Sequence, residues 1–78
     1  MVVEVRLYAT LRRYTPASPD GVISLEVPEG VTILDLVKKI GIDPAEIHLM
    51  MVNGTGCELE KIINSGDRIG LFPPVGGG

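Results

Sequence analysis

The sequence is poor in the residues that carry catalytic and metal chemistry. Its 78 residues include one His, one Cys and no Trp. A single Cys excludes an internal disulfide and indicates a reducing compartment. One His and one Cys cannot supply the usual ligands of a structural zinc site. We therefore expect no bound metal.

Long apolar runs and an excess of positive charge are missing too. No segment approaches the roughly 20 apolar residues of a membrane span, and residues 1–6 have neither the basic region nor the apolar stretch of a signal peptide. Seven Lys and Arg against ten Asp and Glu give a net charge of −3, which disfavours a nucleic-acid binder. The sequence predicts a small cytoplasmic protein with no membrane or nucleic-acid partner.

Glycine and proline, by contrast, are abundant. Ten glycines and six prolines are many for this length, and three of the glycines close the sequence after Pro73-Pro74-Val75. Consecutive prolines favour an extended backbone. We therefore expect one domain over residues 1–75 and a flexible tail over 76–78 that points away from it. An unstructured chain end or a residual linker would have the same composition.

Patterns of apolar residues predict the strands. Apolar and polar residues alternate over 2–8 and 22–27, as in half-buried strands. Short apolar segments predict further strands over 48–52 and 68–72. Turn residues over 53–56 follow the third of these segments.

One amphipathic helix is expected between the second and third strands. Thr32 is a candidate N-cap, and Asp35 has the spacing of its capping-box partner. The apolar residues that follow recur with helical spacing, and Gly41 marks the end of the helix. Asp43 and Pro44 then predict one further helical turn.

This order of elements predicts an α+β fold, the ubiquitin-like β-grasp. A mixed sheet of four to five strands would pack on one main helix, with the first and last strands as neighbours. The alternative is a ferredoxin-like split βαβ fold. That fold needs a second amphipathic helix, for which residues 42–47 and 58–65 are poor candidates.

Catalysis by side chains of this chain is not expected. His48 is the sole imidazole and falls at a strand end, and Cys57 has no basic residue beside it in sequence, as an inert, partly buried thiol would. The carboxylates form no obvious pair, and no phosphate-binding glycine motif is present. The remaining reactive group is the carboxylate of Gly78. Adenylation by a partner enzyme would give that carboxylate a good leaving group.

The end of the sequence resembles a known family. The run Gly66-Asp67-Arg68-Ile69-Gly70-Leu71-Phe72-Pro73-Pro74-Val75-Gly76-Gly77-Gly78 is similar to the C-terminal signature of the MoaD/ThiS sulfur carriers. Residues 7–12 and Val52-Asn53-Gly54 resemble two weaker motifs of that family. The resemblance implies a β-grasp fold, and its Phe-Pro-Pro-Val segment is most like the molybdopterin branch, the small subunit of molybdopterin synthase.

The resemblance also implies roles for particular residues. A MoeB/ThiF-type adenylating enzyme would activate Gly78 with ATP, and a persulfide-derived sulfur would convert it to a thiocarboxylate. Gly76 and Gly77 would pass through a narrow channel of a partner. Arg12 matches a family arginine that would contact a partner or form a surface salt bridge. The segment that would dock on partners consists of Phe72, Pro73, Pro74 and Val75.

Several functions remain open at this point. The sulfur acceptor would be the large subunit of molybdopterin synthase or another acceptor enzyme, such as one for thiamine. A ubiquitin-like modifier conjugated through Gly78 would use the same tail, whereas a β-grasp interaction module would leave it inert. In each case the chain is not an enzyme by itself and holds no cofactor. ATP would be consumed by the activating partner.

Overall fold

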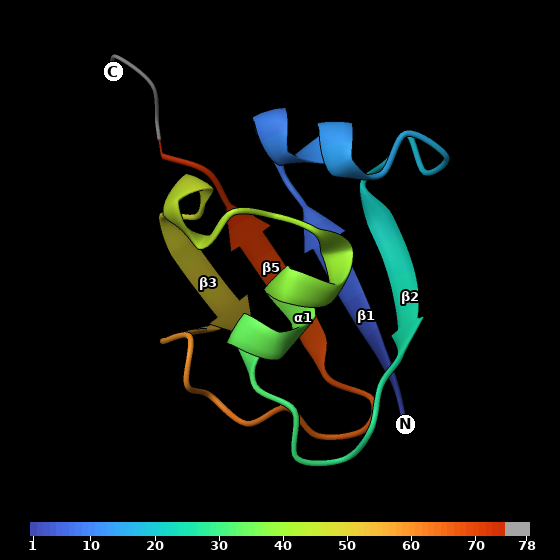
Figure 1. Ribbon diagram of the computed structural model, residues 1–78, viewed down its shortest axis with the longest axis vertical. Coiled ribbons are helices and arrows are strands. Elements are labelled where there is room, and N and C mark those ends of the chain that lie inside the picture. The colour runs from blue at the N-terminus through green and yellow to red at the C-terminus, as the bar shows by residue number, and fades with distance from the viewer. Residues whose placement is uncertain (75–78) are drawn as a thin grey trace.

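Five strands form one mixed sheet with a helix across one face. A computed structural model describes residues 1–74, so Val75, Gly76, Gly77 and Gly78 lie outside the described residues. The sheet order is β2-β1-β5-β3-β4. The strands are β1 (Val2–Leu7), β2 (Val22–Glu26), β3 (Leu49–Val52), β4 (Thr55–Cys57) and β5 (Arg68–Phe72). Figure 1 shows the helix α1 (Ile33–Ile40) in front of the sheet.

The strand pairing confirms the β-grasp prediction. The first and last strands are parallel neighbours, with Val5 opposite Ile69 and Leu7 opposite Leu71. β1 pairs antiparallel with β2, and β5 pairs antiparallel with β3. Within residues 1–74, α1 is the one α-helix, and η1 (Ala9–Tyr14) and η2 (Pro44–Glu46) are 3₁₀ turns. The ferredoxin-like alternative, which needs a second helix, is therefore excluded.

The ends of α1 follow the local sequence. The Asp35 backbone N–H donates to the Thr32 hydroxyl at 3.3 Å, and the Thr32 N–H donates to the Asp35 carboxylate at 2.9 Å. This capping box satisfies two N–H groups that a helix start leaves without partners. Gly41 ends the helix with φ of 93°, a left-handed conformation that glycine adopts without strain.

The core lies between α1 and one face of the sheet. In β1, for example, Val3, Val5 and Leu7 are buried, and the residues between them are not. From α1, Ile33, Leu36 and Val37 pack against this face. The alternating apolar residues of the strands and the helically spaced apolar residues of α1 thus form one apolar layer. Within residues 1–74, no α-helix covers the opposite face of the sheet.

The turn predicted over residues 53–56 is wrong for residues 55–56. Asn53 and Gly54 have φ of 52° and 84°, so they make the whole turn. A tight turn with both residues at positive φ matches sheet twist and lets pairing resume at once. Thr55 and Gly56 therefore belong to β4, opposite Val52 and Met51.

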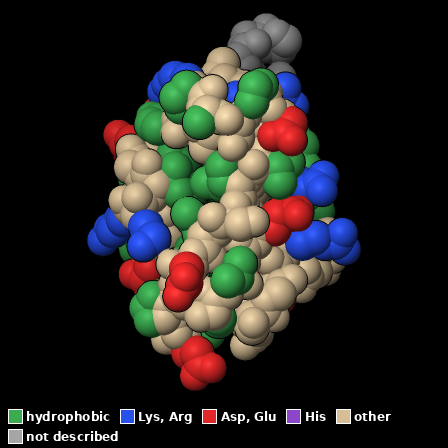
Figure 2. All heavy atoms as spheres, turned by 90° about the vertical axis from the view of Figure 1, so that its right-hand side faces the viewer, with side chains coloured by type: hydrophobic (Ala, Val, Ile, Leu, Met, Phe, Trp, Pro, Cys, Tyr) green, Lys and Arg blue, Asp and Glu red, His purple; other side chains and the backbone are tan. Residues whose placement is uncertain are grey.

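The surface along the β2 edge mixes hydrophobic side chains with charges of both signs (Figure 2). No large region of one charge dominates this side. Among the helices of residues 1–74, none is long and apolar enough to cross a lipid bilayer.

Candidate functional site

The chain leaves the sheet at the end of β5, where hydrogen bonds from segments on both sides hold the strand. The Tyr8 N–H donates to the Leu71 carbonyl at 3.2 Å, and the His48 N–H donates to the Phe72 carbonyl at 2.8 Å. Residues 73–74 are prolines and cannot continue this ladder, because they have no N–H. The end of β5 lies beside η1 and η2, at the top of Figure 1. The docking segment predicted from the sequence therefore starts from a fixed point.

An apolar groove surrounds this exit. It has a volume of about 410 Å³ and is lined by residues 8–10, 48–49 and 72–74. Leu49, at its edge, is 43% exposed, which is high for a large apolar side chain. An exposed apolar surface in a chain this small is typical of a protein-docking site. Phe72, Pro73 and Pro74 thus lie together at one surface, as a shared docking role requires.

Two aromatic rings form one wall of the groove. Tyr8 and Phe72 stack with ring centroids 4.2 Å apart and planes 7° apart. Neither residue is fully buried. Such a pair is worth about 1 kcal/mol beyond the area it buries, so Phe72 is held in place before any partner binds. The sequence analysis assigned Phe72 to docking but did not find Tyr8.

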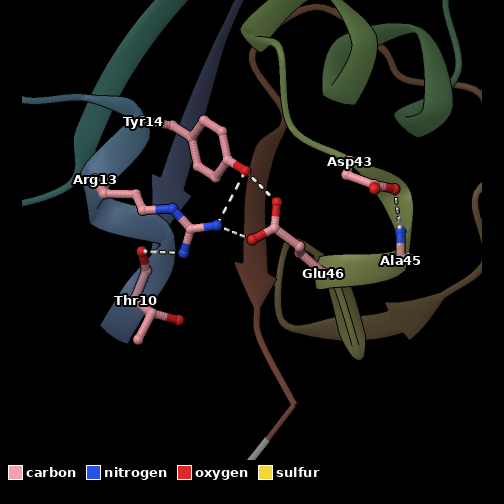
Figure 3. Close-up of polar contacts among 6 residues, drawn as sticks. All are labelled: Thr10, Arg13, Tyr14, Asp43, Ala45 and Glu46. Atoms are coloured by element: carbon pink, nitrogen blue, oxygen red, sulfur yellow. Dashed lines mark hydrogen bonds and ion pairs between the residues drawn. The ribbon is translucent and has the colours of Figure 1, made fainter.

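A polar bridge joins η1 to η2 near the same end of the sheet (Figure 3). The Arg13 guanidinium and the Tyr14 hydroxyl both donate to the Glu46 carboxylate. Arg13 also lies 4.8 Å from the centre of the Tyr14 ring. Because η1 follows β1 and η2 precedes β3, the bridge links elements on both sides of β5. Nothing in the sequence marks a contact between residues so far apart.

This bridge allows a test by double-mutant cycle. The single changes Tyr14→Phe and Glu46→Gln should each lower the free energy of unfolding by about 0.5–1 kcal/mol, because the bridge is partly exposed and screened by water. Urea unfolding of both single variants and the double variant should give a coupling energy of a few tenths of a kcal/mol or more. Glu29→Gln, at an exposed turn, serves as the control. Strict additivity would contradict the bridge.

Arg12 lies outside the groove lining. Its Nε donates to the Leu7 carbonyl at 3.4 Å, and its side chain lies over Gly21. Within residues 1–74, no carboxylate comes within 4.0 Å of its guanidinium, so the alternative of a surface salt bridge is not observed. A partner contact by Arg12 stays a prediction.

His48 and Cys57 do not form a catalytic pair. His48 is exposed and lines the groove, whereas Cys57 is half-buried in β4, with its Sγ 3.7 Å from the Met50 carbonyl. Burial raises the pKa of the Cys57 thiol above its ordinary value. Within the described part of the chain, no group of three or more His, Cys, Asp or Glu side chains is placed to hold a metal ion.

The raised pKa makes Cys57 a poor nucleophile at neutral pH. Since the thiolate is the reacting form and its fraction falls as the pKa rises, the folded protein should react more slowly with iodoacetamide than the unfolded chain does at pH 7.5. The rate should increase as the pH approaches the thiol pKa. The measurement is alkylation followed by intact mass, with the urea-unfolded protein as reference. Equal rates in both states would contradict the assignment.

Comparison with known families decides the lineage. The sequence signature of the ThiS family matches residues 5–78. The chain belongs to the ThiS family. This membership confirms the MoaD/ThiS resemblance. Among curated proteins, no sequence matches the chain.

Solved structures similar to this ThiS-family chain share its whole fold. SAMP1 from Haloferax volcanii is 23% identical, with full coverage of both chains and a TM-score of 0.72. A putative molybdopterin converting factor subunit 1 from Pyrococcus furiosus is 26% identical, covering 96% and 99% of the two chains, with a TM-score of 0.72. Subunit 1 and 2 of molybdopterin-converting factor from Helicobacter pylori form a complex in which a chain is 20% identical, fully covered, with a TM-score of 0.64. These likenesses confirm the β-grasp fold.

Proposed function

We propose that this ThiS-family chain is a sulfur carrier for the synthesis of molybdopterin, the organic part of molybdenum and tungsten cofactors. The observation that carries the proposal is the apolar groove at the end of β5. It lies directly before the glycines that close the sequence. A carrier needs a docking surface next to a slender reactive end. The chain itself offers no catalytic pair among its described residues and would act only with partners.

The chemistry proceeds at the carboxylate of Gly78. A carboxylate oxygen attacks the α-phosphorus of ATP in a MoeB/ThiF-type partner, and pyrophosphate leaves. A persulfide sulfur then displaces AMP from the acyl adenylate, and a thiol reductant cleaves the resulting S–S bond to release the thiocarboxylate. Gly76 and Gly77 lack a Cβ and so fit a channel only as wide as a backbone.

The acceptor in this proposal is the large subunit of molybdopterin synthase. Two likenesses support it. The putative molybdopterin converting factor subunit 1 from Pyrococcus furiosus is 26% identical over nearly the whole chain. The Helicobacter pylori relative is a complex of subunit 1 with subunit 2 of the converting factor. A thiamine-type acceptor remains the alternative within the same chemistry.

A second candidate function is a ubiquitin-like modifier. The observation in its favour is the similarity to SAMP1, a small archaeal modifier protein, from Haloferax volcanii. The Gly78 acyl adenylate would then pass to the amino group of a lysine on a target protein. The product would be an isopeptide bond in place of a thiocarboxylate.

One experiment tests the proposal. The purified chain is incubated with ATP, a persulfide source and the MoeB/ThiF-type enzyme of the same organism, and its intact mass is measured. Conversion to the thiocarboxylate replaces one oxygen by sulfur and raises the mass by that difference. A variant lacking Gly77 and Gly78 is the control and should not shift. An unshifted mass in the full chain would overturn the sulfur-carrier function, and Gly78-dependent lysine adducts in extracts would favour the modifier.

A further inference from the structure

The face of the sheet opposite α1 has a hollow of its own. It has a volume of about 270 Å³ and lies over the middle of β5. Its described lining combines aromatic, aliphatic and cationic side chains. They include Arg6, Tyr8, Met51, Arg68 and Phe72 around Gly70. The stacked rings of Tyr8 and Phe72 are shared with the apolar groove at the strand end.

Gly70 lines this hollow, and the backbone there does not require a glycine. It lies inside β5, between buried Ile69 and Leu71, and its φ is outside the left-handed region. A Cβ added there would meet only the rings of Phe72 at 3.4 Å and Tyr8 at 3.5 Å, which is ordinary contact. Glycine inside a strand costs about 0.5–1 kcal/mol relative to Ala. The absent side chain therefore leaves room for something from outside.

The charged side chains that line the hollow are cationic, although Glu4 lies opposite Arg68 in the sheet. The net charge is −3, yet the charged side chains among the described lining residues are Arg6 and Arg68. Within residues 1–74, no carboxylate comes within 4.0 Å of the Arg68 guanidinium. Arg6 donates to Glu4 at 2.8 Å, and this hydrogen bond raises the pKa of Arg6 above its ordinary value. Arg68 therefore offers donors that no described carboxylate uses.

We propose that the hollow over Gly70 receives an apolar side chain of the adenylating partner, and that a carboxylate next to that side chain pairs with Arg68. This inference rests on the proposed sulfur-carrier function. The partner must hold residues 72–74 to receive the tail, and the Tyr8–Phe72 wall makes groove and hollow one surface. A partner that covers the groove therefore also reaches the hollow. The partner surface that faces Arg68 must be negatively charged, because like charges would repel.

The test measures binding of the intact chain to the MoeB/ThiF-type enzyme of the same organism. Arg68→Glu should slow association about tenfold at low salt and weaken the salt dependence, because opposite charges steer encounter. Lys39→Glu, the same charge change on exposed α1, is the matched control and should leave the rate near that of the parent. Gly70→Val should raise Kd at least tenfold, since its side chain fills the hollow, and a Tm near that of the parent checks that the sheet still folds.

Two results would overturn the inference. The first is unchanged association for Arg68→Glu, or faster association of the parent as salt is added. The second is parent-like affinity for Gly70→Val. Thiocarboxylate formation by the parent chain separates this failure from failure of the proposed function. If the parent chain forms the thiocarboxylate and both variants bind normally, only the proposed role of the hollow is refuted.

Discussion

Replacement of Gly21 by Ala is expected to lower the free energy of unfolding by about 3 kcal/mol or more. Gly21 precedes β2 with φ of +74°, a conformation that costs any residue with a Cβ about 1 kcal/mol or more. The added Cβ would also lie 2.3 Å from the Leu7 carbonyl oxygen, which is backbone and cannot rotate away. The Gly21 carbonyl accepts from the Leu7 N–H at 2.8 Å, so any shift breaks the pairing where β1 ends.

The matched control for this prediction is Gly30→Ala. Gly30 has φ of +83°, but a Cβ there would meet no atom within 4 Å. It should therefore cost only the backbone strain, about 1 kcal/mol. Urea and thermal unfolding measure both variants, and for a chain of this size each kcal/mol corresponds to about 4–8 °C in Tm. Equal losses at Gly21 and Gly30 would mean that the close approach to Leu7 has no energetic weight.

The difference between these two glycines shows what the sequence can predict. Both read as turn residues, and both do have positive φ. Features set by near neighbours were predictable in the same way, such as the Thr32–Asp35 capping box and Gly41 at the helix end. Alternation predicted which face of β1 is buried. These signals act within a few residues, so the sequence alone carries them.

Contacts that depend on strand register or on distant turns were not predictable. The contact of Gly21 with Leu7 depends on strand register, and the Glu46 bridge joins two turns from different parts of the chain. The short strand β4 was missed because a tight Asn53–Gly54 turn and a longer loop have similar composition. For the candidate site, the sequence predicted Phe72 but not its stacking partner, because it predicted that the first and last strands are neighbours but not the register that places Tyr8 beside Phe72.

Phe72→Ala is expected to weaken binding to the adenylating partner about 30-fold or more, the usual effect of removing an aromatic residue central to an interface. Phe72 lines both the apolar groove and the hollow over Gly70, whereas Pro73 and Pro74 line the groove alone. Loss of its ring also leaves Tyr8 without a stacking partner. The stability cost should stay near 1 kcal/mol, because Phe72 is not part of the buried core.

The kinetic form of this loss identifies its cause. Phe72 lies several residues before Gly78 and does not take part in the chemical step, so thiocarboxylate formation should show a raised KM with a nearly unchanged kcat. Ile62→Ala is the control, since Ile62 is 55% exposed but lies outside the groove and hollow linings. It removes exposed apolar surface elsewhere on the chain and should leave KM unaffected. If Ile62→Ala and Phe72→Ala raised KM equally, general surface hydrophobicity rather than the end of β5 would drive docking. If Phe72→Ala lowered kcat alone, the aromatic pair would position the tail within an already bound complex.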